Sequence, residues 1–73
     1  MKMGVIIKNE RKLLNLSQSA LAKILNTTQD TVSLWELNKR TPDAEMIVKL
    51  CKLFQVSADY LLGLENEDGT KNR

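Results

Sequence analysis

The apolar residues of this chain recur at helical spacing almost throughout. In the first segment Met3, Ile7 and Leu14 share one face with the aliphatic stem of Arg11, which predicts a helix from Met3 to about Leu14. Asn15 then breaks the pattern. Residues that favour strands are few, so the pattern indicates an all-α fold.

A second helix is predicted to begin after Ser17, whose hydroxyl can accept a hydrogen bond from a backbone N–H of the first turn. Leu16 and Leu21 occupy the positions of a hydrophobic staple around this cap. Asn26 is expected to end the helix, because asparagine tolerates the left-handed backbone conformation. The predicted buried stripe consists of Leu21, Ala22 and Leu25.

A third helix is predicted from Gln29 to about Leu37, with Thr28 as its N-terminal cap. One side of this helix carries Val32, Trp35 and Glu36. The other side is mostly polar and is expected to face away from the core. It consists of Asp30, Ser33 and Leu34.

Asn38 is expected to end the third helix and to be followed by a basic link. A fourth helix is predicted to start at Pro42 with Thr41 as its cap, because proline suits the first position of a helix. This helix should end near Gln55. Its predicted buried face, at the spacing of an amphipathic helix, consists of Ile47, Leu50, Cys51 and Phe54.

A short fifth helix is predicted after Ser57, with Val56 and Leu61 as a second hydrophobic staple and Gly63 at its end. The five helices predict one domain over residues 1–64. Residues 65–73 contain no apolar residue, so we expect them to form a fraying, disordered polar tail.

Composition narrows the classes of function. The chain has 73 residues, a net charge of +2 and no histidine, and Cys51 is its only cysteine. Histidine-based catalysis, an internal disulfide and the usual zinc sites are therefore excluded, and we expect inert packing for Cys51 and no catalytic, metal or cofactor site. The apolar runs are too short to cross a membrane and no signal peptide is recognisable, so we expect a cytoplasmic protein.

The second and third helices are joined by a turn at Asn26, Thr27 and Thr28. A capped helix, a short turn and a second helix with one buried edge are typical of a helix-turn-helix, in which the second helix lies in the major groove of DNA. The alternative is a plain helical hairpin within a bundle. The weak positive charge permits nucleic-acid binding without establishing it.

A group of motifs resembles the Cro and phage-repressor (XRE-like) family over about residues 5–64. These motifs are Leu16-Ser17-Gln18 with Leu21-Ala22, Thr31-Val32-Ser33, Trp35-Glu36, Lys39-Arg40, Pro42, and Val56-Ser57-Ala58-Asp59-Tyr60-Leu61-Leu62-Gly63. The resemblance implies a compact five-helix, lambda-repressor-like domain that binds double-stranded DNA as a homodimer on an inverted-repeat operator and regulates transcription, most often as a repressor. Two positions depart from the family: Asn26 stands where glycine is common, and Leu37-Asn38 where Asn-Gly is common.

The resemblance implies roles for individual residues. Gln18 should bind a phosphate and steady Gln29, whose amide can contact N6 and N7 of adenine. Asp30 either accepts a hydrogen bond from cytosine or simply favours the positive end of the helix. The expected reading face consists of Thr28, Gln29, Asp30, Ser33 and Leu34, and the expected phosphate clamp consists of Lys39 and Arg40.

Arg11 and Glu36 match paired positions in the family and fall on otherwise apolar faces, so we expect a partly buried ion pair between them. A second functional class is a protein-binding member of the same fold, such as an antitoxin or an antirepressor-like partner. Leu34 and Leu37, if exposed, would suit that role. An enzyme is poorly supported, because nothing resembles a paired-carboxylate site, a phosphate loop or a metal cluster.

Overall fold

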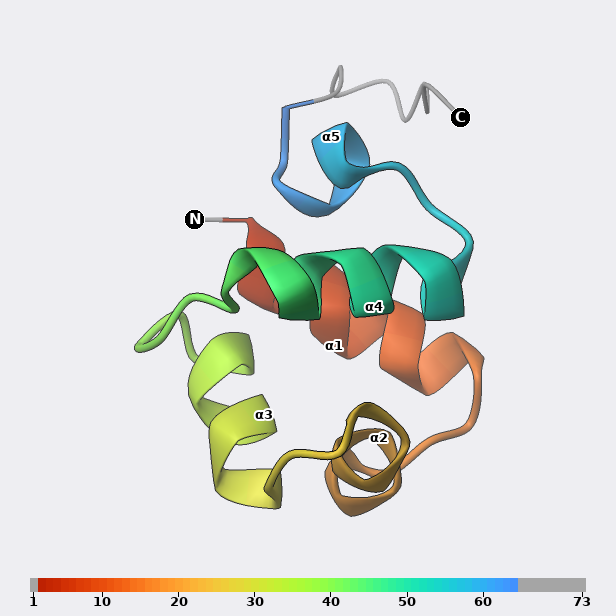
Figure 1. Cartoon of the computed structure of the whole chain (residues 1–73), viewed down its shortest axis with the longest axis vertical. Helices are drawn as coiled ribbons and strands as arrows, with labels where there is room; N and C mark the ends of the chain where they lie inside the picture. The colour runs from red at the N-terminus through yellow and green to blue at the C-terminus, as the bar shows by residue number, and fades with distance from the viewer. Residues whose placement is uncertain (1, 65–73) are drawn as a thin grey trace.

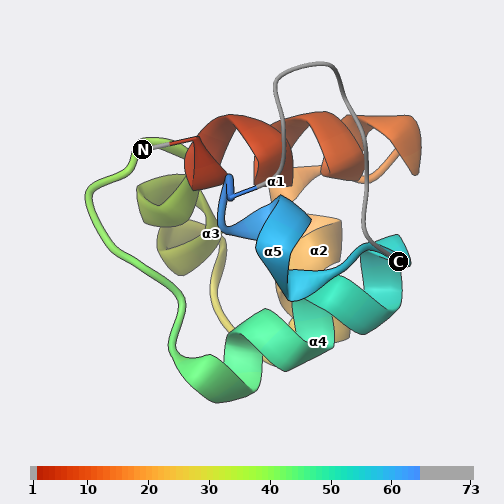
Figure 2. The ribbon, with the colours of Figure 1, turned by 90° about the horizontal axis from the view of Figure 1, so that it is seen from above.

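The computed structural model describes residues 2–64, which fold into five helices. The predicted tail, residues 65–73, lies outside the described residues. In Figure 1, α2 and α3 lie together at one end of the molecule and α5 at the other, and Figure 2 shows α1 and α4 on opposite sides. The helices are α1 (Met3–Leu13), α2 (Gln18–Leu25), α3 (Gln29–Glu36), α4 (Ala44–Phe54) and α5 (Ala58–Leu61).

Three of the predicted N-terminal caps are confirmed. The hydroxyl of Ser17 accepts a hydrogen bond from the backbone N–H of Ala20 at 3.0 Å, and Ser57 accepts one from Tyr60 at the same distance. Thr28 accepts from Thr31 at 3.2 Å. Each bond satisfies one of the N–H groups that the first turn of a helix leaves without a partner.

The predicted start of α4 is wrong. Asp43, not Thr41, caps this helix, and its carboxylate accepts the backbone N–H of Met46 at 2.9 Å. Pro42 lies buried in the preceding link instead of at the first helical position. The physical reason is that a carboxylate is a stronger cap than a threonine hydroxyl, since its charge also favours the positive end of the helix.

Each helix is followed by a residue with a positive φ, and the three predicted asparagine stops are confirmed. After α2 the N–H of Thr27 donates a hydrogen bond to the carbonyl oxygen of Ala22 at 2.8 Å. After α3 the N–H of Lys39 donates to the carbonyl oxygen of Leu34 at 2.9 Å. This is the hydrogen-bond pattern of a Schellman motif, which occupies carbonyls that a helix end leaves free. The residues with positive φ are Asn15, Asn26, Asn38, Gln55 and Gly63.

Leu14 does not belong to the buried face of α1, contrary to the prediction. It follows the last helical residue and is 45% exposed. The helix ends at Leu13 and the chain turns at Asn15, whose φ is 57°, instead of continuing along the buried face. Leu37 likewise follows α3 and is 60% exposed.

The core is built from the apolar stripes of all five helices. The predicted stripe of α2 is fully buried, and so are Val32 and Trp35 of α3. Leu16 and Val56 pack with this core as the staples predict. The buried apolar residues are Met3, Ile7, Leu21, Ala22, Leu25, Val32, Trp35, Leu50, Phe54, Val56 and Leu61.

Cys51 is only half-buried on α4. Burial nevertheless raises the pKa of its thiol, which disfavours the reactive thiolate. This direction agrees with an inert packing role. None of the helices between residues 2 and 64 combines the length and the apolar character that a bilayer crossing would need.

Gly4 marks a close approach that the sequence pattern did not reveal. Its N–H donates to the side-chain oxygen of Asn38 at 3.1 Å, across the contact between α1 and the end of α3. A Cβ atom at this position would lie 2.6 Å from the carbonyl oxygen of Glu36 and 2.7 Å from that of Trp35. Gly4 therefore lets the N-terminal turn of α1 touch the backbone that ends α3.

Candidate nucleic-acid interface

The candidate interface is formed by α2, the turn after it and α3 (Figure 1). Asn26 closes α2 with a φ of 59°, and Thr28 opens α3, so only a short turn separates the two helices. Ala22 of α2 and Val32 of α3 are buried at 2% and 0% exposure, which ties the pair to the core. The opposite side of α3 is left accessible.

The predicted reading face lies at the start and along the outer side of α3. Thr28, Gln29 and Asp30 are exposed, whereas Ser33 and Leu34 are half-buried. The hydroxyl of Thr28 is already engaged in the cap. Gln29 and Asp30 are therefore the exposed residues of the leading turn whose side chains the cap does not use.

The expected support of Gln29 by Gln18 is wrong. Gln18 donates from Nε2 to Oε1 of Glu36 at 3.1 Å, whereas Gln29 accepts at Oε1 from the hydroxyl of Ser19 at 3.0 Å. Successive helical residues point about 100° apart, so Gln18 and Ser19 face opposite ends of α3. The structure thus exchanges the expected partner for its neighbour, a residue that sequence reasoning missed.

Arg11 and Glu36 are brought together as expected. Their Nε and Oε2 atoms are 2.7 Å apart, a second bond of 3.1 Å joins Nη2 to Oε1, and the side chains are only 10% and 4% exposed. Arg11 also donates from Nη1 to the carbonyl of Leu16 at 2.8 Å. With Gln18 on Oε1, this network joins α1, the first residue of α2 and the last residue of α3. The network therefore fixes the C-terminal end of α3, the candidate reading helix, to both α1 and α2.

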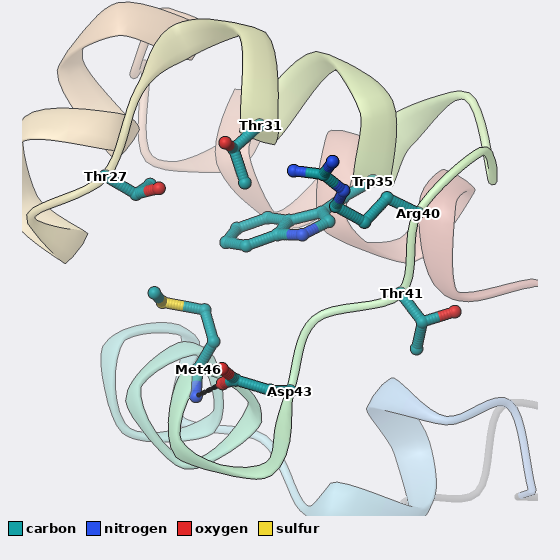
Figure 3. A pocket seen from close by; sticks show the side chains of 7 residues that line it. All are labelled: Thr27, Thr31, Trp35, Arg40, Thr41, Asp43 and Met46. Carbon is teal, nitrogen blue, oxygen red and sulfur yellow. Dashed lines mark hydrogen bonds between the residues drawn. The ribbon is translucent and has the colours of Figure 1, made fainter.

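The predicted phosphate clamp follows α3 directly. Lys39 and Arg40 are both exposed, and their N–H groups bond the carbonyl of Leu34, which fixes the backbone of the link. Arg40 also lines a cavity of about 290 Å³ between α3 and the start of α4, where Figure 3 shows Met46 pointing toward the indole of Trp35. The cavity is lined by Thr27, Thr31, Trp35, Arg40, Thr41, Asp43 and Met46.

Asp43 is the one acidic residue of that lining. It caps α4 and gives the cavity a negative side beneath the cationic link. A carboxylate here weakens any anion site inside the cavity, because like charges repel. Any phosphate contact of the predicted clamp is therefore expected at the solvent-exposed parts of Lys39 and Arg40 and not inside the cavity.

Two capped helices that are joined by a short turn and each bury one side in the core, with the leading turn of the second exposed, define the chain as a helix-turn-helix protein. A sequence profile of the helix-turn-helix family matches residues 7–61, and the chain belongs to that family.

Relatives of known kind support this membership. The chain is 38% identical over 60 residues to repressor protein C2 of Salmonella phage P22, and 36% identical over 72 residues to the HTH-type transcriptional regulator ImmR of Bacillus subtilis strain 168. The alignments cover 82% and 99% of this chain but only 28% and 56% of the two relatives. The chain thus spans about half or less of the length of these proteins.

Two solved structures have the same fold. The crystal structure of the P22 c2 repressor in complex with a synthetic operator superimposes with a TM-score of 0.80 at 36% identity, covering 86% of this chain and 96% of that one. The solution structure of the DNA-binding domain of the same repressor gives a TM-score of 0.77 at 34% identity, covering 97% and 90%. The all-α, five-helix prediction is confirmed.

Proposed function

We propose that this protein is a sequence-specific DNA-binding regulator of transcription and that it acts as a repressor. The observation that carries the proposal is the exposed leading turn of α3, a helix whose last residue is held by a buried ion pair, in a fold shared with a repressor solved on its operator. Residues 1–64 would form the DNA-binding domain.

In this proposal α3 lies in the major groove and α2 braces the pair against the DNA backbone. Gln29 is the principal base reader, because a glutamine amide can contact both N6 and N7 of adenine. Asp30 either accepts a hydrogen bond from the amino group of cytosine or only stabilises the positive N-terminal end of α3. Thr28, Ser33 and Leu34 complete the surface that faces the bases.

Phosphate contacts position the domain without reading sequence. Lys39 and Arg40 are the best candidates, because both are cationic, exposed and fixed at the backbone just beyond α3. Gln18 and the N–H groups of the first turn of α2 can hold a phosphate on the other side of the groove. The side-chain amide of Gln18 would bind the phosphate while it keeps its hydrogen bond to Glu36.

Readers and positioners should respond differently to substitution. Gln29→Ala should cost about 1–3 kcal/mol on the preferred operator, chiefly by relaxing choice at one base pair, with little change in salt dependence. Arg40→Ala should weaken all DNA sequences similarly and reduce the slope of log K against log salt by about 1. Binding isotherms at several salt concentrations, on operator and on random duplex, separate the two classes.

Lys49→Ala is a suitable control. Lys49 carries the same single positive charge as Arg40 but lies on α4, where its Nζ atom is 3.7 Å from Oε1 of Glu45. Lys49→Ala should change neither the affinity for DNA nor the salt slope by as much as Arg40→Ala does, and it should leave the specificity unchanged. Equal weakening of specific and random DNA by Gln29→Ala would show that the reading face is assigned wrongly.

We further propose that the protein binds DNA as a homodimer, with two α3 helices about 34 Å apart on an inverted repeat. Leu61 is fully buried and completes the core, whereas Leu64 and Val48 are 71% and 52% exposed near the C-terminal half of the fold. Of these three residues, only Leu64 and Val48 have side chains that a second copy of the chain could contact. A protein partner such as an antirepressor would find a separate apolar contact at Leu37, which is 60% exposed.

A further inference from the structure

Gln29, the first residue of α3, is tied to α2 by a side-chain hydrogen bond. The hydroxyl of Ser19 donates to Oε1 of Gln29 at 3.0 Å, and both residues are exposed. The two helices that carry them are fixed by Leu21 and Val32, each fully buried. The bond therefore spans two rigid elements and not a loose surface.

The chemistry of the amide makes this bond informative. A glutamine side chain has one acceptor oxygen with two lone pairs and one NH₂ group with two donors. The Ser19 bond uses one lone pair of Oε1 and holds the oxygen on the side of α2. What remains for DNA is one lone pair of Oε1 and both hydrogens of Nε2, at a position that the bond to α2 fixes.

A base edge recognises the position of these groups. Adenine offers a donor at N6 and an acceptor at N7, so a glutamine reads it only when its oxygen and its nitrogen lie opposite both atoms at once. A serine hydroxyl can donate to the amide oxygen or accept from the NH₂ group, so the bond fixes where the amide lies and leaves its sense to the base. Without that partner the exposed side chain can occupy other staggered rotamers, and it must be ordered when DNA binds.

We propose that Ser19 is a specificity-determining positioning residue, which holds the Gln29 amide in place before DNA arrives and thereby sharpens the choice of adenine at the base pair that Gln29 reads. The inference rests on the proposed function, since it requires Gln29 to face bases. It adds a residue of α2 to the determinants of sequence choice. Ser19 itself need not touch the DNA.

The test is a double-mutant cycle read at one base pair. Binding of wild type, Ser19→Ala, Gln29→Ala and the double variant is measured on the preferred duplex and on the three duplexes substituted at the Gln29-dependent position. We expect Ser19→Ala to reduce discrimination there by about fivefold, the factor that corresponds to one net hydrogen bond of about 1 kcal/mol. Affinity for random duplex and the salt slope should not change.

Two comparisons distinguish positioning from a structural role. Ser19→Thr retains the hydroxyl and should restore discrimination, and in the Gln29→Ala background Ser19→Ala should have no effect at that base pair. Unchanged discrimination in Ser19→Ala would overturn the inference, as would an equal loss with and without Gln29. If wild type itself shows no base preference that depends on Gln29, the proposed reading function has failed instead.

Discussion

Replacing Glu36 with alanine should lower the free energy of unfolding by about 3 kcal/mol, because it leaves the guanidinium of Arg11 buried without its counter-ion. In a domain of this size each kcal/mol corresponds to roughly 4–8 °C in Tm, so the melting temperature should fall by more than about 10 °C. Thermal and urea unfolding followed by circular dichroism measure both quantities. DNA affinity should fall as well, because Glu36 also holds Gln18 at the start of α2.

Glu45→Ala is the matched control. Glu45 also forms an ion pair, with Lys49 four residues along α4, but its side chain is 80% exposed. Exposed pairs of this kind contribute about 0.3–0.5 kcal/mol, so Glu45→Ala should hardly move the transition. If the Glu36→Ala and Glu45→Ala variants both have the melting temperature of the wild type, the Arg11–Glu36 ion pair does not hold α1 to α3.

Gly4→Ala should also destabilise the fold, although alanine is the better helix former by about 1 kcal/mol. The added Cβ would lie 2.6 Å from the carbonyl oxygen of Glu36 and 2.7 Å from that of Trp35, and backbone atoms cannot move aside as a flexible side chain can. Forced displacement of packed helices typically costs about 1–3 kcal/mol. The shift would also break the bond from the Gly4 N–H to Asn38.

Asn9→Ala provides the comparison for helix propensity, since Asn9 is exposed on the same helix. It should be neutral or slightly stabilising. The difference in unfolding free energy between the two variants then measures the close contact together with the hydrogen bond to Asn38. A Gly4→Ala protein as stable as Asn9→Ala would mean that α1 and α3 do not approach as closely as described.

The features predicted correctly from sequence are those set by neighbouring residues. Ser17, Thr28 and Ser57 cap helices because a hydroxyl before an apolar helical pattern meets the first free N–H groups within three residues. Asn26 ends α2 in the left-handed conformation for an equally local reason. The order of five helices and their buried stripes follows from this local chemistry together with the period of the apolar residues.

The features missed depend on which elements meet in space. Gly4 matters because the end of α3 lies against it, and Asn38 is 34 residues away along the chain. The partner of Gln29 is Ser19 and not Gln18 because of the rotation of α2 about its axis, which apolar spacing determines only coarsely. A glycine inside an otherwise apolar helical segment was the one available signal, since such a residue costs about 1 kcal/mol unless packing requires it.

The most direct test of sequence-specific DNA binding is selection of bound duplexes from a random pool, followed by sequencing. The proposed function predicts enrichment of one inverted repeat, with half-sites centred about one helical turn apart and one position in each that loses its preference in Gln29→Ala. Enrichment of a single half-site would retain the reading function and remove the homodimer. A pool that stays random through the selection, with binding that depends only on salt, would contradict the function itself.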